Sequence, residues 1–183
     1  MRKRWLRTNV EQIGLPTKLA GDWLEHDLAY AYDYYLDLKA ALLKKKLKYY
    51  DSISYLVMDD DGNVKRIHVR VGDIVDIEEE TEGIAYAQVK AIVTHMHNSG
   101  KTYPFFIFNW FADTDRTHNI LGVPIYIFQN TSDQRWRRVY PIMQVNRASR
   151  AHFVHYCTRN CTVTKHDEAA SRFFKNEFFY NAV

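Results

Sequence analysis

The sequence predicts a mainly β protein with some α structure, in which a long N-terminal amphipathic helix precedes a small β-barrel. Three observations support this fold class. Apolar residues recur at spacings of three and four between residues 17 and 50, which is typical of one face of a helix. From residue 51 the pattern changes to alternation, which is typical of strands. Between residues 71 and 112 the alternating runs are separated by two polar turns, each closed by a glycine.

The first unit, residues 1–50, is expected to be a basic arm followed by the helix. The arm places Arg2, Lys3, Arg4 and Arg7 around Trp5. Such a cluster suits phosphate contact or nuclear import, and a solvated terminus explains it equally well.

The helix is expected to begin near Thr17 and to continue to Tyr50. Its apolar face consists of Leu19, Trp23, His26, Tyr30, Tyr34, Leu38, Ala41 and Leu42. So broad a face predicts packing on the barrel or on another chain. The helix closes with Lys44, Lys45, Lys46 and Lys48. The helix dipole favours one or two cations there, and the full set also suits a DNA backbone.

The second unit, residues 51–183, is expected to be the barrel. SISYLVM and VKRIHVRV flank the turn DDDGN, and an Asp-Gly step between alternating runs predicts a hairpin. The stretch from Val71 to Ala112 continues as strand, turn, strand, turn and strand. A further strand is expected in NILGVPIYIFQN, and if AHFVHY is also a strand, His155 and Cys157 share one face. The aromatic tail, which contains Phe173, Phe174, Phe178, Phe179 and Tyr180, is expected to pack back on the barrel or the helix.

Composition and charge narrow the environment and the partners. The chain has 13 Tyr, 10 Phe and 4 Trp, more rings than a core of this size needs, so some are expected to line a binding surface. Residues 1–50 hold 10 Lys and Arg against 6 Asp and Glu, residues 51–100 hold 4 against 10, and residues 101–183 hold 11 against 6. This distribution suits contact with both a basic protein tail and a phosphate backbone, and solvation alone also explains it. No run approaches the roughly 20 apolar residues of a transmembrane helix, so no membrane partner is expected.

A second basic patch lies in SDQRWRRVYP, where Arg135, Arg137 and Arg138 flank Trp136. Charges for phosphates and a ring for stacking are what a nucleic-acid surface needs. An edge strand protected by charge is the alternative.

Candidate zinc ligands lie in HFVHYCTRNCTVTKH. His155 or His166 together with Cys157 and Cys161 is the set expected if the metal is bound. The spacing matches no standard zinc arrangement, and buried Cys and His on a strand explain it as well. Two cysteines four residues apart form a poor disulfide framework, which favours a reducing, intracellular compartment.

Five segments resemble a divergent bromo-adjacent homology (BAH) domain: HVRVGDIVDI, IAYAQVKAIVTH, FFIFNWFADTD, ILGVPIYIF and WRRVYPIMQV. In that family a V-x-D-x-V strand is followed by a Y-x-A-x-I strand and then by a V-x-W-F-Y strand that ends in an acidic loop. The resemblance runs from Ile67 to the C-terminus. It implies a BAH-like barrel in a nuclear, chromatin-associated module that binds a histone tail or another protein partner.

Several BAH domains hold methylated lysine in an aromatic cage, because ring faces attract a weakly hydrated cation. Tyr86 matches the Tyr of Y-x-A, and Trp110 matches the Trp of W-F-Y with Phe111 beside it. Ala112 stands where cage-bearing members have a second aromatic residue. The resemblance therefore favours a general interaction module over a methyl-lysine binder.

The polar loop ADTDRTHN follows Trp110 and contains Asp113 and Asp115. Both carboxylates are expected to accept hydrogen bonds from a basic tail, or else to shape the turn.

Two other function classes stay open: a nucleic-acid-binding barrel that uses the basic patches, and a scaffold subunit whose helix and tail pack on another chain. An enzyme is not expected, because the sequence has no G-x-S-x-G elbow, no Gly-rich phosphate loop and no H-E-x-x-H motif. Apart from the candidate zinc ligands, no cofactor is expected.

Overall fold

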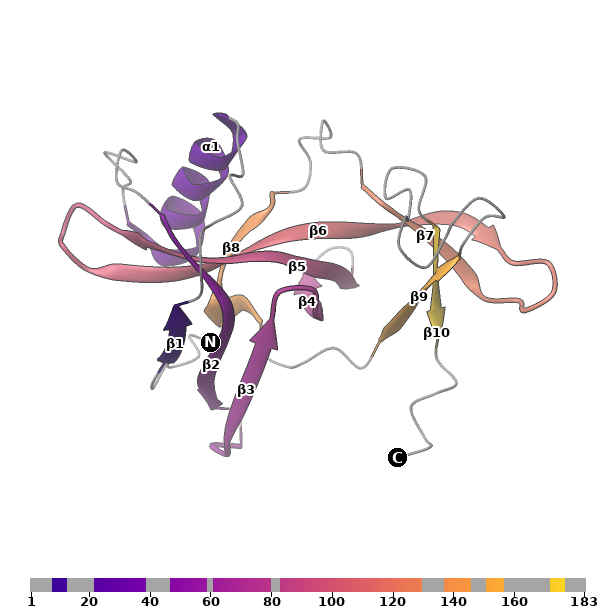
Figure 1. The fold of residues 1–183 in the computed structure, drawn as a ribbon, viewed down its shortest axis with the longest axis horizontal. Helices are drawn as coiled ribbons and strands as arrows, with labels where there is room; N and C mark the ends of the chain where they lie inside the picture. The colour runs from indigo at the N-terminus through magenta and orange to yellow at the C-terminus, as the bar shows by residue number, and fades with distance from the viewer. Residues whose placement is uncertain are drawn as a thin grey trace.

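Ten antiparallel strands form one open sheet in the computed structural model of this protein (Figure 1). The structure describes residues 8–12, 22–38, 47–58, 61–79, 83–129, 137–145, 151–156 and 172–176. The strands are β1 Thr8–Gln12, β2 Lys48–Met58, β3 Val64–Arg70, β4 Ile74–Glu79, β5 Gly83–Met96, β6 Thr102–Thr117, β7 Pro124–Phe128, β8 Val139–Pro141, β9 His152–Tyr156 and β10 Arg172–Asn176. The main path through the sheet is β1-β2-β5-β6-β7-β10-β9, while β3, β4 and β8 pair with β2, β5 and β6 respectively.

The predicted hairpins are confirmed. β2 pairs with β3 across the DDDGN turn, and β5 pairs with both β4 and β6. Gly62 has a φ of 82° and Gly100 has a φ of 80°, values that L residues rarely adopt. These two glycines therefore close their turns for the conformational reason that the sequence indicated.

The predicted long helix is wrong in its length. Within the described residues, the helical stretch consists of α1, Asp22–Tyr30, and a π-helical turn, Ala31–Tyr35. It ends at Asp37, which has a φ of 54°, and the N–H of Leu38 donates to the carbonyl of Tyr32 at 2.9 Å. Lys48, expected at the end of the helix, is instead the first residue of β2. Tyr49 and Tyr50, which follow it, pair with Val93 and Ile92.

The boundary expected at residues 50/51 falls inside β2. This strand begins at Lys48, and β1 from the expected basic arm pairs with it between Thr8 and Gln12. A BAH-like barrel is not confirmed, because the strands hydrogen-bond in an open order.

β6 joins two parts of the sheet. Its residues 102–110 pair with β5, and the segment Phe105–Ile107 also pairs with β8. Its residues 111–117 pair with β7 instead, through a register shift between Asp113 and Thr117. The expected loop ADTDRTHN is therefore corrected, because its residues up to Thr117 belong to β6. Figure 1 shows β7, β9 and β10 gathered at this end of β6, away from α1.

Two apolar clusters bury opposite faces of β5 and β6. One contains Phe106, Phe108 and Trp110 with residues of β2, β3 and β4. The other contains Phe105 and Ile107 beneath α1. The alternation of Phe105 to Trp110 between the two clusters follows the pleat of the strand. The helix therefore covers one face of the central strands, and the N-terminal strands enclose the other.

The prediction that the aromatic tail packs back is confirmed for Phe173 and Phe174. Both lie on β10, which pairs with β7 on one side and β9 on the other. Phe178, Phe179 and Tyr180 lie outside the described residues.

Candidate functional site

The two residues that the family motif assigns to a cage, Tyr86 and Trp110, lie on opposite faces of the sheet. Ala87 pairs with Trp110 across the β5–β6 ladder, and directly opposed side chains share a face. Tyr86 precedes Ala87, and successive side chains on a strand point to opposite faces. Trp110 is also buried, with 3% of its surface exposed. The predicted pairing of Tyr86 and Trp110 in one site is therefore corrected.

Trp110 has a structural role between the core and β8. Its indole Nε1–H donates to the carbonyl of Arg137 at 2.6 Å. The ring packs against Phe108 at 5.5 Å and against Tyr140 at 5.4 Å between centroids. A buried indole needs such a partner for its N–H, and here the partner is the chain segment that leads into β8.

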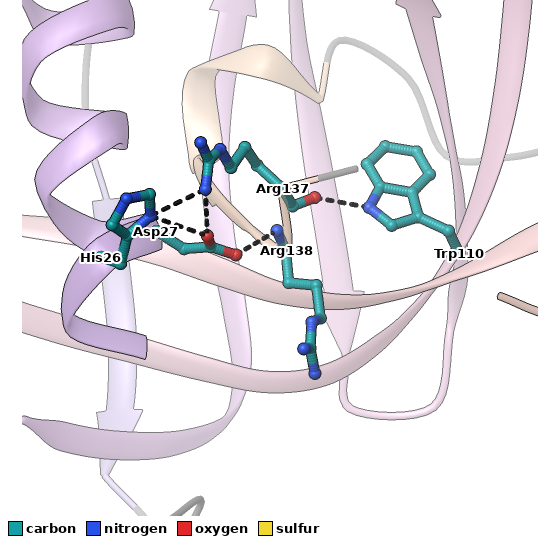
Figure 2. A network of polar contacts seen from close by, with 5 residues as sticks. All are labelled: His26, Asp27, Trp110, Arg137 and Arg138. Carbon is teal, nitrogen blue, oxygen red and sulfur yellow. Dashed lines mark hydrogen bonds and ion pairs between the residues drawn. The ribbon is translucent and has the colours of Figure 1, made fainter. Parts of the chain in front are cut away.

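Arg137 and Arg138 hold α1 on the sheet (Figure 2). Asp27 on α1 is 6% exposed, and its carboxylate accepts hydrogen bonds from the Arg137 guanidinium at 3.2 Å and from the backbone N–H of Arg138 at 2.8 Å. The Arg137 guanidinium also lies 2.7 Å from Nδ1 of His26, where Figure 2 shows it pointing toward the helix. A buried carboxylate is stable only when it is paired in this way.

The guanidinium groups of Arg137 and Arg138 rest on aromatic rings of the helical stretch. The Arg137 guanidinium lies 4.9 Å from the ring centroid of Tyr30, and that of Arg138 lies 4.0 Å from the ring of Trp23. Burial lowers the pKa of Arg138, and the Asp27 carboxylate acts in the opposite direction. Both arginines are thus engaged within the chain, and nucleic-acid binding through them stays a prediction.

The other nucleic-acid candidates are not brought together by the described residues. Lys48 is exposed at the start of β2. The remaining candidates, Arg2, Lys3, Arg4, Lys44, Lys45, Lys46, Arg135 and Trp136, lie outside the described residues.

Zinc binding stays a prediction. His155 is half-buried on β9, with its ring 5.5 Å from that of Phe173. Cys157, Cys161 and His166 lie outside the described residues. Within the part of the chain that the structure describes, no three His, Cys, Asp or Glu side chains are grouped as metal ligands.

Six rings from five strands form a continuous surface that we call the aromatic face. It consists of Tyr86 on β5, Phe111 on β6, Tyr126 and Phe128 on β7, Phe153 on β9 and Phe173 on β10. The rings of Phe111 and Phe153 are stacked at 4.1 Å, and Phe173 lies 5.1 Å from Phe111 and 4.7 Å from Phe128. These contacts form because strands distant in sequence pair in the order β6-β7-β10-β9 and place residues of one parity together.

The aromatic face continues the face of the sheet that α1 covers. Phe111 follows Phe105 and Ile107 along β6 at even spacing, so the three side chains share one face. Phe105 and Ile107 pack beneath α1, whereas Phe111 packs against Phe153 of β9. The helix and β9 thus cover different lengths of the same face.

Tyr86, Tyr126 and Phe153 form one corner of this face, which we call the cation corner. Their ring centroids are separated by 5.4 Å for Tyr86 and Phe153, 5.1 Å for Tyr126 and Phe153, and 6.4 Å for the two tyrosines. Both tyrosines are half-buried, unlike the buried Phe153. The ammonium nitrogen of Lys175 lies 4.6 Å from the ring centroid of Tyr86, within the range of a cation–π interaction.

Two carboxylates lie beside the cation corner. Asp76 on β4 is directly opposite Tyr86, and Asp113 on β6 is directly opposite Tyr126. Opposed side chains on one face have Cβ atoms about 5 Å apart, so each carboxylate is a neighbour of a ring. Asp113 Oδ1 also accepts the N–H of Asp115 at 2.8 Å, and Asp115 has a φ of 55°. Asp115 therefore shapes the local bend of β6. This agrees with the interpretation that the acidic residues shape the turn.

An apolar pocket of about 320 Å³ lies near the start of β6. Its lining includes Leu36, Tyr103, Pro104, Ile142 and Met143, with Lys101 among the polar residues. Among the described lining residues, Lys101 is charged, and none has a carboxylate or an imidazole group.

Sequence reasoning missed four residues of this site: Asp76, Tyr126, Phe153 and Lys175. The available signal was alternation in PIYIF, where Tyr126 and Phe128 lie two residues apart, whereas HFVHY and RFFKN do not alternate in this way. Parity does not say which strands are neighbours, so the rings were not grouped.

Comparison with models of known protein families found no match, and comparison with curated proteins found none either. Among the described residues, no helix is long and apolar enough to span a bilayer. Function is therefore inferred from the geometry of the cation corner.

Proposed function

We propose that this protein is a nuclear, chromatin-associated interaction module of BAH-like type, which binds a basic protein tail, such as a histone tail, at the cation corner. The observation that carries the proposal is the position of the Lys175 ammonium, 4.6 Å from the ring of Tyr86. A corner that accommodates an ammonium of the chain itself has the chemistry needed to accommodate one from a partner. The proposed role is binding rather than catalysis.

The electrostatics of the corner favour a cation. Ring faces attract ammonium groups by about 0.5–1 kcal/mol at exposed sites and by about 2 kcal/mol when the cation is desolvated. Asp76 and Asp113 add negative charge beside the rings. The segment 51–100, which includes β4 and β5, carries 10 acidic against 4 basic residues. This local field attracts a basic tail before the rings contact it.

The proposed site retains Tyr86 of the family cage but replaces its other walls. In this proposal Phe153 and Tyr126, whose rings lie 5.4 Å and 6.4 Å from that of Tyr86, serve as the walls that the family motif assigns to Trp110 and to position 112. The BAH-like character of the fold is part of the same proposal. It is supported by the order of the strand motifs along the sequence.

Binding is tested by calorimetric titration with a lysine-rich histone-tail peptide and with the same peptide carrying norleucine in place of lysine. We expect binding of the first peptide only. Tyr126→Leu keeps apolar volume but removes the aromatic ring, so affinity should fall about fivefold, which corresponds to about 1 kcal/mol. Tyr34→Leu is the matched control, because Tyr34 is 68% exposed on the helical stretch.

Equal binding of the lysine and norleucine peptides would rule out the cation corner as the site. A DNA duplex is titrated in parallel at several salt concentrations. If DNA alone binds, with affinity that falls by a log–log slope near −0.9 for each phosphate contacted, the nucleic-acid function replaces the one proposed here.

A further inference from the structure

The cation corner is occupied by a side chain of the protein itself. Lys175 lies on β10 directly opposite Phe153 of β9, so both side chains share the aromatic face. Its ammonium nitrogen is 4.6 Å from the ring centroid of Tyr86 on β5. The residue as a whole is half-buried.

We infer that Lys175 is an internal competitor for the cation corner, so that a lysine side chain of a partner binds only by displacing it. This inference rests on the proposed function, because it concerns the same rings. It adds that the free protein is held in a self-occupied state. The affinity for a basic tail then depends on how much more strongly the partner's ammonium group interacts with the cation corner than the ammonium group of Lys175 does.

The fold allows Lys175 to leave without opening the sheet. The backbone of β10 is paired with β7 through Arg172, Phe173 and Phe174, and its pairing with β9 extends from Arg172 to Asn176. Phe173 is anchored by rings on two other strands. The long, flexible stem of a lysine can change rotamer while this backbone stays in place. Displacement therefore requires a side-chain movement only.

The cation–π contact between Lys175 and Tyr86 is weak enough for a partner's lysine to replace it. A partly exposed cation–π interaction of about 0.5–1 kcal/mol corresponds to a factor of about two to five in a dissociation constant. Removing the internal ammonium should thus strengthen binding of an external one by about two- to fivefold.

The test compares Lys175→Gln with Lys101→Gln in the full chain, using calorimetric titration with the lysine-rich peptide. Both substitutions remove one positive charge, and Lys101 is exposed in the turn at the other end of β6. Any attraction that depends only on the net charge of the protein is therefore the same in both variants. We expect Lys175→Gln to bind about two- to fivefold more tightly than Lys101→Gln.

Nuclear magnetic resonance gives a second measurement on the wild-type chain. The Cε protons of Lys175 lie near the face of Tyr86, so their resonances should be shifted upfield and should move to unperturbed positions as the peptide is added. Equal affinities of the two variants, or Lys175 resonances that stay shifted at saturation, overturn the competitor role while wild-type binding still supports the proposed function. If neither the wild type nor the variants bind the peptide, both proposals fail.

Discussion

Asp27 is the residue whose removal should most clearly destabilise the helix on the sheet. In Asp27→Ala the backbone N–H of Arg138 loses a buried partner at 2.8 Å, and an unsatisfied buried amide costs about 1–3 kcal/mol. Arg137 loses an ion pair at 3.2 Å, but its side chain is 27% exposed and can be rehydrated, so this loss is about 1 kcal/mol. The expected decrease in the free energy of unfolding is therefore about 2–4 kcal/mol.

Urea unfolding at neutral pH, followed by circular dichroism and by tryptophan fluorescence, measures this decrease. For a chain of this size it corresponds to a fall in melting temperature of about 4–16 °C. Asp27→Asn retains an acceptor for the Arg138 N–H, so it should cost about 1 kcal/mol. Glu25→Ala is the control, because it removes an exposed carboxylate from the same helix and should change stability by less than about 0.5 kcal/mol. If Asp27→Ala is no less stable than Glu25→Ala, the carboxylate does not hold α1 in place.

Three further predictions follow from other contacts. Trp110→Phe should lower the free energy of unfolding by about 1–3 kcal/mol, because the carbonyl of Arg137 loses its donor. The same substitution should leave peptide affinity unchanged in calorimetry. A loss of affinity without destabilisation would show that Trp110 belongs to the binding site. Ala112→Tyr should not strengthen peptide binding, because position 112 lies on the face opposite Tyr86; a gain in affinity would contradict the strand register. Burial raises the pKa of Tyr55 above its ordinary value of 10.0, so its contribution to stability is complete below pH 10 and is lost as the pH rises beyond it. Urea unfolding between about pH 9 and pH 11 should therefore show a smaller alkaline loss of stability for Tyr55→Phe than for the wild type.

Local chemistry made much of the sheet predictable. Asp-Gly and Ser-Gly steps between alternating runs identified the hairpins around Gly62 and Gly100, since both signals act within a few residues. The end of the helix was not predictable in the same way. Tyrosines continue at helical spacing up to Tyr35 and reappear at Tyr49, and a tyrosine fits either a helix face or a strand. Tyr49 lies in a strand because it pairs with Val93, which is far along the chain.

The cation corner could not be predicted from the sequence for a different reason. Tyr86 was identified from its own strand, but Phe153 and Lys175 reach it only because β9 and β10 pair with each other and β10 pairs with β7. Those pairings join residues separated by long stretches of chain. No local pattern encodes such neighbours, whereas the face on which each residue lies follows from its position in the strand.

The strand β6 separates residues of the core from residues of the proposed binding site. Trp110 and Phe111 are consecutive, so the pleat sends one side chain to the core and the other to the aromatic face. A site that used both rings would require a break in this alternation between positions 110 and 111, but Trp110 packs in the core cluster while Phe111 stacks on Phe153. Residues on the Trp110 side should accordingly affect the unfolding free energy, whereas Tyr86 and Tyr126 should affect the dissociation constant. A family motif read along the strand cannot make this distinction, because it records which residues are consecutive and not which face each one occupies.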